Sequence, residues 1–483
     1  MKLKRISQLL VAFSLLVGND VLSQSLSLDE AVEYMLDRNE KVKQYKAKVE
    51  EKKYEEKAAW GNFLPTVNAL GGYTYLSENV KINGEHLQGS VDEFAGEVGK
   101  SVKQAVEPVI GGLPPNLQHV AGQFIGALST IDLKVPNLEI DKQDILTANI
   151  VALQPLYLGG KVRAGLKYAK AEHRTAEIEL EHTEHEMTRE VIQQYLGVAL
   201  LKQAVDTRER VLKGMRQHET NAKKLIGQGV IPQHYLLRAK VAVADAEQEL
   251  DDNKNKLDLA WMALKTTLGF PVDTVLTLSD SLHFKIDPTT LDFAKNAAIS
   301  HQPMLRLIDQ KELMVKQKLN VKRSEFLPKI FAFGEYGFNR EDLPIIQPPA
   351  MVGVQLKFNI FNGFKDVHEY KAAKQLSSQV AFARNYAKKR VNLWVTKSYK
   401  EVLNAKDKYK KLGHTIDLAG ENLRLNDRRF KEGMATSLEV IDARLMLQGA
   451  ELKRLSALYE YYIALSELHL ASGQPEKVIE ILK

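Results

Sequence analysis

The chain has 483 residues, of which 44% are hydrophobic, 27% are charged and 7% are aromatic. This composition supplies an ample hydrophobic core and excludes a disordered chain. The formal net charge is +6, and the sequence contains no dense Lys and Arg run with interleaved aromatic residues, so nucleic acid is not an expected partner.

The first 23 residues are expected to be a cleaved export signal. They have a basic start, an apolar run over residues 9–17 and a small-residue site just before Gln24. The chain has no Cys, so an exported protein would be held together without disulfides and without a lipidated N-terminal Cys. Since no other run approaches 18 apolar residues, the mature protein is expected to be either soluble or a β-barrel.

The sequence repeats itself. "FLPTVNALGGYTY" begins at Phe63, and "FLPKIFAFGEYGF" begins 263 residues later at Phe326. "LDEAVEYMLDRNE" from Leu28 matches "LDFAKNAAISHQP" from Leu291 at the same offset. Further along, "PLYLGG" and "FNIFNG" match with an offset close to 204. This self-similarity indicates two copies of one structural unit.

Each copy is expected to begin with a helix of about 35 residues. Ser27 and Glu30 form a capping-box pattern ahead of a periodic stretch that ends near Asn62, and Thr290 opens the matching stretch, which ends at Glu325. The Pro of each "FLP" stops the helix. Alternating apolar and polar residues then predict strands, most clearly over residues 352–360.

Two very long helices follow the strands. The intervals from Gly160 to Gly229 and from Gly363 to Gly433 contain no Pro and keep a 3,4 spacing of apolar residues. Helices of this length span on the order of 100 Å at 1.5 Å per residue. A further helix returns in each half and ends at Gly269 or Gly473, since Gly is favoured at helix ends.

The expected organisation is therefore mainly α, with a small β-part. The domains expected are a signal peptide (1–23), a first repeat (24–270), a linker (271–290), a second repeat (291–475) and a tail (476–483). The first repeat contains an insertion, expected to be extracellular, at about residues 77–144. Four strands with an apolar face cannot close a barrel, so several chains must share one. Two chains would supply eight strands, a barrel filled by side chains, whereas three would supply twelve strands and a lumen, so a conduit favours three or more.

This layout resembles the TolC-like outer-membrane efflux and secretion channels. The resemblance is carried by the paired "FLP" joints, the "PLYLGG" and "FNIFNG" joints, and the paired segments "LIGQGVIPQHYLLRAK" and "RFKEGMATSLEVIDAR". It implies a homotrimer whose twelve-stranded barrel in the outer membrane continues as a helical tube across the periplasm. It also implies a periplasmic membrane-fusion adaptor and an inner-membrane pump of the RND, ABC or MFS type, with drugs, metal ions or proteins as cargo.

The resemblance also implies an acidic constriction at Glu439 and Asp442, which lie three residues apart on one helical face. The alternative for Glu439 is a capping box with Thr436. Polar links at the closed tip are expected around Tyr235 and Arg238. At two further positions of that network, Phe430 and Ala435, this chain lacks the polar groups. Arg238 is then expected either to meet Glu439 or Asp442 or to be solvated.

The helix tips would be the adaptor-docking loops. The expected docking residues are Gly229, Val230, Ile231, Gly433, Met434 and Ala435. A plain helix cap and turn would explain the Gly residues equally well.

No enzyme, cofactor or metal site is expected. His182, His185 and Glu186 lack the order of a zinc protease motif, and a solvated helical face is the favoured interpretation of that stretch. A secreted or periplasmic coiled-coil scaffold or adhesin without a pore is the main alternative to a duct. A porin, which supplies every strand from one chain, and an enzyme are more distant alternatives.

Overall fold

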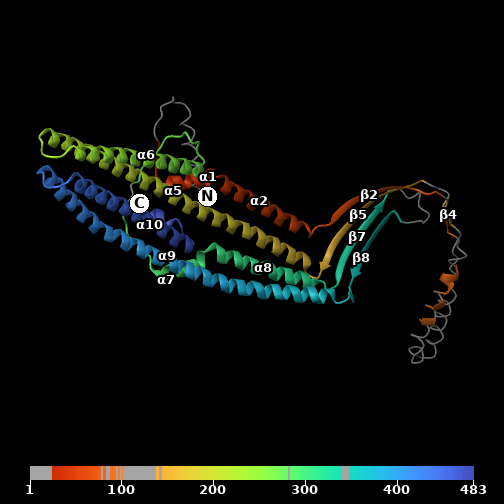
Figure 1. Cartoon of the computed structure of the whole chain (residues 1–483). Helices are drawn as coiled ribbons and strands as arrows, with labels where there is room; N and C mark the ends of the chain where they lie inside the picture. Colours follow the sequence, from red (N-terminus) through yellow and green to blue (C-terminus); the bar gives the residue numbers. More distant parts are fainter. Residues whose placement is uncertain are drawn as a thin grey trace, which may run out of the picture. The chain divides into compact units, whose positions relative to one another are not determined.

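The computed structural model describes residues 24–77, 80–82, 88–93, 96–97, 100–101, 138–140, 144–280, 283–338 and 348–482 (Figure 1). The expected signal segment and most of the expected insertion lie outside these residues. The chain forms two compact units. The helical unit comprises Met1–Ala59, Arg163–Lys322 and Lys365–Lys483, and the sheet unit comprises Trp60–Val162 and Arg323–Phe364.

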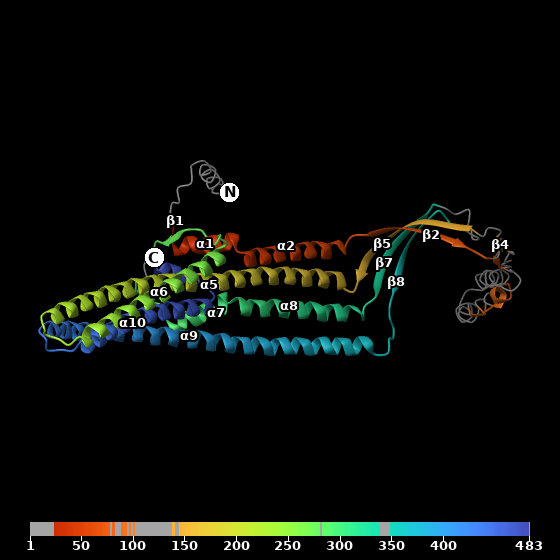
Figure 2. The same ribbon diagram turned by 45° about the horizontal axis from the view of Figure 1, so that its top comes forward.

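The helices of the two halves match in order and length. The first half contains α1 (Leu28–Arg38), α2 (Glu40–Gly61), α5 (Lys161–Gly227) and α6 (His234–Leu268). The second half contains α7 (Leu291–His301), α8 (Pro303–Ser324), α9 (Lys365–Lys431) and α10 (Ser437–Ala471), followed by α11 (Lys477–Leu482). Both long helices, α5 and α9, have 67 residues, and both return helices, α6 and α10, have 35, in agreement with the expected lengths (Figure 2).

The expectation of one opening helix of about 35 residues per half is wrong, because each is broken into two. The break in the first half is Asn39, whose backbone is extended and whose Oδ1 accepts the Lys41 backbone N–H at 2.9 Å. The break in the second half is Gln302, which precedes Pro303. A residue before Pro is disfavoured in the helical conformation, and Asn competes for backbone hydrogen bonds through its side chain.

The two break residues make equivalent contacts with the return helices. The Asn39 side-chain amide donates to the Thr267 carbonyl at 2.9 Å, near the end of α6. The Gln302 side-chain amide donates to the carbonyls of Leu470 and Ala471, at the end of α10. These bonds satisfy carbonyls that a helix end leaves without an intrahelical partner.

The glycines that follow these return helices are required by close packing. Gly269 has φ 75°, and a Cβ built on it would lie 2.9 Å from the Arg38 Cβ. Gly473 has φ 77°, and its Cβ would lie 2.7 Å from the His301 backbone. Any other residue would combine a left-handed backbone with a steric clash.

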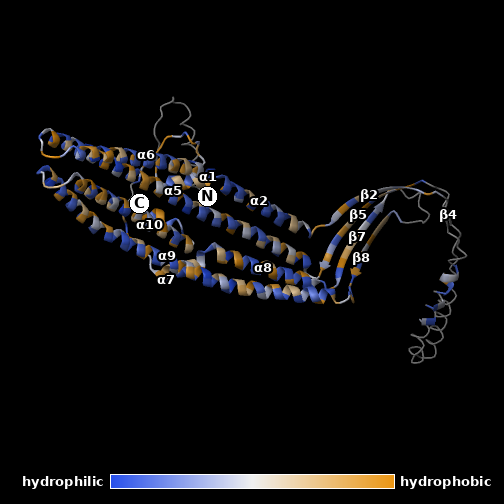
Figure 3. Cartoon of the chain, in the orientation of Figure 1, coloured by the Kyte–Doolittle hydropathy of each residue, from blue (hydrophilic) through white to orange (hydrophobic). Residues whose placement is uncertain are grey.

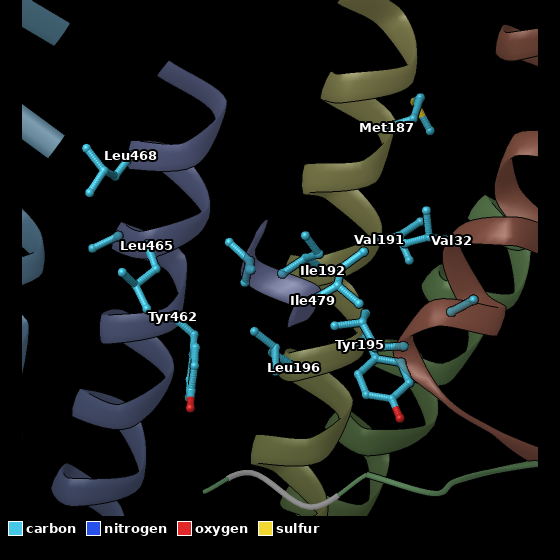
Figure 4. Close-up of a cluster of buried hydrophobic side chains, with 14 of the residues drawn as sticks. Val32, Met187, Val191, Ile192, Tyr195, Leu196, Tyr462, Leu465, Leu468 and Ile479 are labelled. Carbon is cyan, nitrogen blue, oxygen red and sulfur yellow. The ribbon is translucent and has the colours of Figure 1, made fainter. Parts of the chain in front are cut away.

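The main core of the helical unit has residues from all of its helices, and Figure 4 shows the part between α1, α5, α10 and α11. The side chains labelled there are Val32, Met187, Val191, Ile192, Tyr195, Leu196, Tyr462, Leu465, Leu468 and Ile479. Strand β1 (Gln24–Leu26) pairs in parallel with β6 (Leu276–Leu278) beside this core. Helix α11 lies within the expected tail and buries Val478 and Ile479 there. The tail is thus part of the folded core.

The expected linker, residues 271–290, is fixed to α10 by buried polar contacts. His469 Nε2 lies 2.9 Å from Asp287 Oδ2, and both side chains are almost fully buried. Tyr461 donates to the Lys285 carbonyl at 3.0 Å, and Tyr462 donates to the His283 carbonyl. Buried polar groups in this segment therefore have partners, as a stable core requires.

Helix α2 is hydrophilic along nearly its whole visible surface in Figure 3, and Val42 is its buried residue. Among the described residues, no helix combines the length and the hydropathy that a membrane crossing needs.

The sheet unit contains an antiparallel sheet in the order β2 (Thr66–Tyr75), β5 (Asp144–Leu158), β7 (Lys329–Gly337) and β8 (Ala350–Lys357). The short strands β3 (Val80–Ile82) and β4 (Leu138–Ile140) pair within the expected insertion. A register shift between Pro155 and Tyr157 marks a bulge in β5, where Pro can be accommodated. Strand β8 ends at Lys357, so the expected strand over residues 352–360 is too long at its end.

Candidate functional site

One face of the four-stranded sheet is apolar across all four strands. Residues opposite each other in an antiparallel sheet point to the same face, so the register assigns each side chain to a face. Apart from Asp144 and Gln154, the residues on this face are largely apolar: Val67, Ala69, Gly71, Tyr73, Tyr75, Leu146, Ala148, Ile150, Ala152, Ile330, Ala332, Gly334, Tyr336, Ala350, Val352, Val354 and Leu356. Several of these side chains are widely exposed, Val352 at 89% and Val354 at 67%.

The opposite face is mixed in character. It contains Thr66, Asn68, Leu70, Gly72, Thr74, Ile145, Thr147, Asn149, Val151, Leu153, Phe331, Phe333, Glu335, Met351, Gly353, Gln355 and Lys357. Asn149 donates from its side-chain amide to the Glu335 carboxylate at 3.0 Å across this face. A sheet with one apolar and one mixed face is suited to a boundary between an apolar medium and water.

Both outer strands have a free edge within one chain. Strand β2 pairs with β5 alone and β8 pairs with β7 alone among the described strands. A free edge presents unpaired backbone N–H and C=O groups, which an apolar medium does not tolerate. Both edges of the described sheet are therefore open to pairing with another strand.

The two turns that end the long helices have the same backbone geometry. Gly229 has φ 75° and donates its N–H to the Ile226 carbonyl, and Val230 donates to Leu225. In the second half, Gly433 has φ 72° and donates its N–H to the Phe430 carbonyl. Met434 donates its N–H to the Arg429 carbonyl. This is the Gly-capped helix end that the sequence predicts.

The turns lie against each other over a small apolar cluster, which we call the tip cluster. A Cβ on Gly433 would lie 3.2 Å from the Val230 side chain. The buried members of the tip cluster are Ala222, Ile231, Ala239, Phe430, Ala435 and Val440, with Leu225, Ile226, Tyr235 and Leu236 packed against them. Phe430 and Ala435, where polar groups were expected to be missing, are thus buried apolar contacts.

A buried histidine extends this packing towards the rest of the bundle. His218 of α5 is 2% exposed, and its Nε2 lies 2.7 Å from Ser437 Oγ at the start of α10. Its ring stacks at a tilt on Phe430, with 4.7 Å between centroids. Burial, followed by the positive charge of Arg444, lowers the pKa of His218 to about 4.

Glu439 makes the capping box that the sequence offered as the alternative to a pore lining. Its Oε2 accepts the Thr436 backbone N–H at 2.6 Å and the Thr436 hydroxyl at 2.9 Å. These hydrogen bonds, the backbone one first, lower the pKa of Glu439. Its Oε1 lies 3.8 Å from Arg429 Nη1. Asp442 lies one turn further along α10 and is exposed.

Tyr235 and Arg238, the two residues expected to link the tip, both lie on α6 but have different surroundings. Tyr235 is half-buried against the tip cluster, and its backbone carbonyl accepts a bond from Ser437 Oγ at 3.4 Å. Arg238 is exposed, and within the described part of the chain Glu439 pairs with Arg429 instead of with Arg238. Arg429 also donates to the Met434 carbonyl at 3.2 Å. The contacts by which Arg429 joins α9 to the turn could not be predicted from the sequence, where the only indication was its position in the last turn of the helix.

The six expected docking residues divide into two groups. Gly229, Val230, Gly433 and Met434 are exposed, whereas Ile231 and Ala435 are each 8% exposed and belong to the tip cluster. A docking partner can therefore reach the first four without disturbing the packing.

The histidine-containing stretch of α5 is not a solvated face. His182 and His185 are both half-buried, and His185 Nδ1 is buried without a hydrogen-bond partner. Glu181 of the same stretch forms an ion pair with Arg306 of α8. The described residues contain no group of three or more side chains that could hold a metal ion.

Comparison with known proteins identifies the family. Residues 128–270 and 296–474 match the family model described as outer membrane efflux protein. No curated protein sequence matches the chain. The fold is similar to VceC of Vibrio cholerae, with a TM-score of 0.70 and 14% identity over 92% of this chain and 96% of VceC. It is also similar to the open state of the MtrE channel of Neisseria gonorrhoeae, with a TM-score of 0.68 and 16% identity over 93% of this chain and 89% of MtrE.

A membrane protein from Pseudomonas aeruginosa gives a TM-score of 0.70 at 15% identity, over 92% of this chain and 90% of that one. The likeness to these solved structures concerns the fold, and it agrees with the resemblance to TolC-like channels. Since the family model covers more than half of its residues, the chain belongs to the outer membrane efflux protein family, whose channels are transport ducts without enzymatic activity.

Proposed function

We propose that three copies of this chain form the outer-membrane exit duct of a tripartite efflux or type I secretion system. The duct conducts drugs, metal ions or proteins passively from an inner-membrane pump of the RND, ABC or MFS type, through a periplasmic adaptor. The observation that supports this function is the four-stranded sheet, with one apolar face, one mixed face and two free edges.

The sheet supports both an outer-membrane location and an assembly of three copies. Its apolar face suits contact with lipid and its mixed face suits a water-filled lumen, while the free edges require neighbours. Two copies would give eight strands, a barrel whose interior is filled by side chains. Three copies give twelve strands and an open lumen.

The long helices supply the periplasmic part of the duct. Helices α5 and α9, each of 67 residues, extend on the order of 100 Å at 1.5 Å per residue. The exposed turn residues Val230 and Met434 give the adaptor a small apolar contact at their far ends. A scaffold or adhesin built on the same helices would have no use for the exposed apolar sheet face.

Single-particle imaging tests the duct directly. The protein is extracted from the outer-membrane fraction in mild detergent and viewed by negative stain. Rods longer than about 100 Å with threefold end views, as the helix length requires, are expected. Compact particles, or filaments without a detergent belt, would contradict a duct.

The constriction is assigned to Asp442, with Glu439 as a second carboxylate. Three exposed Asp442 side chains around one axis would attract multivalent cations and repel each other. Glu439 contributes less, because the capping box already occupies one of its carboxylate oxygens.

Channel recordings in planar bilayers separate the two carboxylates. Asp442→Asn is expected to weaken block by a multivalent cation strongly, and Glu439→Gln to weaken it slightly while preserving the helix cap. Asp417→Asn, a change at an exposed acid on α9, is the matched control. Cation block that survives the double variant Glu439→Gln with Asp442→Asn would exclude this constriction.

A further inference from the structure

A cavity of about 410 Å³ lies between α5, α9 and α10, within the helical unit of one chain. Its volume is in the range of small-molecule binding sites. Four of the residues that line it carry a charge: Asp206 and Arg210 on α5, and Glu451 and Arg454 on α10. We call it the three-helix cavity. The function proposed above gives it no role.

Two of the four charged residues are paired with each other. Arg210 Nη2 lies 3.6 Å from Glu451 Oε2, and it donates to the Thr207 hydroxyl at 3.0 Å. Arg210 is therefore engaged with these groups and not with Asp206, which lies four residues earlier on the same helix. Asp206 is exposed, and within the described part of the chain no Lys, Arg or His nitrogen lies within 4.0 Å of its carboxylate.

Arg454 is the second unpaired charge, and aromatic rings hold it in place. Its guanidinium carbon lies 4.7 Å from the centre of the Tyr409 ring, and Tyr409 stacks on Phe284 with 4.7 Å between the ring centroids. Arg454 Nε is buried without a hydrogen-bond partner, and no carboxylate oxygen of the described residues lies within 4.0 Å of this side chain. The guanidinium is thus oriented, but its capacity to bind an anion is unused.

The arginines on the facing helix differ in this respect. Arg208 Nη2 lies 2.8 Å from Glu249 Oε2, and Arg210 has Glu451 as its partner. An arginine that lines a cavity and has no carboxylate partner is therefore a distinct feature of this part of the bundle.

We infer that the three-helix cavity binds a small zwitterion with an apolar body, such as a dipeptide with free termini. The carboxylate of the ligand bonds to the Arg454 guanidinium, and its ammonium group bonds to the Asp206 carboxylate. The ion pair between Arg210 and Glu451 remains intact. The site is contained in one chain, so this inference goes beyond the proposed duct and does not depend on the number of copies.

The balance of charges favours a zwitterion over a simple ion. Arg210 and Glu451 neutralise each other, which leaves Asp206 and Arg454 with opposite charges. An anion alone would meet the repulsion of Asp206, and a cation alone would meet that of Arg454. Since Asp206 and Arg454 do not contact each other, a ligand that carries both charges can bridge them. A carboxylate also matches the two-pronged geometry of a guanidinium.

Apolar side chains provide a surface for the body of the ligand. They are Tyr409 and Ile416 on α9, and Leu455 and Leu458 on α10. Leu458 is 4% exposed and the other three are half-buried. An apolar lining with a few placed polar groups is the usual composition of a ligand site. In a dipeptide one peptide unit separates the charged termini, so both can reach side chains that do not touch.

Equilibrium dialysis of the full-length protein in detergent, with radiolabelled leucyl-phenylalanine, tests the site. The N-acetyl derivative lacks the ammonium group and the C-terminal amide lacks the carboxylate, so the two serve as matched competitors. The parent protein is expected to bind the dipeptide saturably. It should bind either derivative at least about tenfold more weakly, because each has lost a charged hydrogen-bonding group.

Variants assign each charge of the ligand to one side chain. Asp206→Asn and Arg454→Gln should each weaken binding of the dipeptide at least about tenfold. Asp206→Asn should also bind the dipeptide and its N-acetyl derivative equally, and Arg454→Gln should bind the dipeptide and its amide equally. Asp252→Asn and Arg390→Gln, at exposed positions outside the cavity, are the matched controls and should bind like the parent.

The ligand series distinguishes recognition from a loss of structure, because a misfolded variant would not lose discrimination against one derivative alone. No saturable binding of the dipeptide by the parent would overturn the site. Equal affinity of the parent for the dipeptide and its N-acetyl derivative would overturn the zwitterion. Discrimination that persists in both variants would place the binding elsewhere in the protein and overturn the assignment to this cavity. None of these outcomes bears on the duct, which imaging tests.

Discussion

His218 and Ser437 join the long helix α5 to the start of the return helix α10, with 2.7 Å between His218 Nε2 and Ser437 Oγ. The contact lies next to the tip cluster, and Phe430 of α9 stacks on the same imidazole. Helices α5, α9 and α10, which adjoin the two turns, thus meet at the buried imidazole of His218. The protonation state of this imidazole therefore affects how firmly the two turns pack together.

Mild acid is expected to loosen the tip through His218. The pKa is about 4 in the folded protein and 6.5 for an ordinary His, so the unfolded tip binds more protons between these values. The contribution of neutral His218 to the stability of the tip is fully present above pH 6.5. It is lost as the pH decreases towards 4, and the loss amounts to about 3 kcal/mol. Hydrogen exchange of peptides from residues 222–240 and 430–443 should accelerate between pH 7.5 and pH 5, after correction for the intrinsic rate.

His218→Asn should abolish most of that pH dependence, while His234→Asn, at an exposed His beside the same turn, should retain it. The window above pH 5 avoids titration of Glu439, whose pKa lies below its ordinary value. Equal pH dependence in the two variants would exclude His218 as the cause.

Phe430→Ala should open the closed tip. Phe430 is 1% exposed, and removal of a buried Phe side chain costs about 3 to 5 kcal/mol because a cavity remains. Single-channel conductance should rise, since the packing between the two turns is lost. Leu425→Ala, at a half-exposed site on the same helix, is the control and should leave conductance unchanged. Similar traces for both variants would assign tip closure to other contacts.

A charge on the apolar sheet face should prevent assembly, and the same charge on the mixed face should be tolerated. Val354 and Gln355 are adjacent, exposed and on opposite faces of β8. Arg on the lipid side of a membrane barrel costs up to about 2 to 4 kcal/mol. The yield of oligomer from the outer-membrane fraction should fall for Val354→Arg and persist for Gln355→Arg. The reverse order would mean that the faces are assigned to the wrong sides.

Gly473→Ala should destabilise the helical unit by about 2 to 4 kcal/mol, since it adds a left-handed alanine and a clash with the His301 backbone. Gly413→Ala, within α9 and with open space around it, should be neutral or slightly stabilising. Thermal unfolding in detergent compares the two variants with the parent. A melting temperature that is the same for Gly473→Ala and the parent would contradict the steric account.

The periodic elements could be predicted from the sequence alone. The capping box at Ser27 and Glu30, the Pro-free intervals of the long helices and the paired Gly turns all depend on neighbours within a few residues. Helix caps and helix periodicity depend on residues that are close together in the chain, so they can be recognised in a single sequence. The order of the elements then indicated a channel fold, which the family match confirms.

The tertiary structure decided the features that depend on distant residues. The helix breaks at Asn39 and Gln302 have local causes, but the carbonyls that their side chains bind lie 228 and 168 residues away along the chain. The burial of His218, the pairing of Glu439 with Arg429 and the packing of α11 also arise between helices, because burial depends on what covers a side chain. Strand β8 ends at Lys357, although the alternating pattern of the sequence continues to Ile360, because pairing with a neighbouring strand, and not side-chain pattern alone, sets where a strand ends.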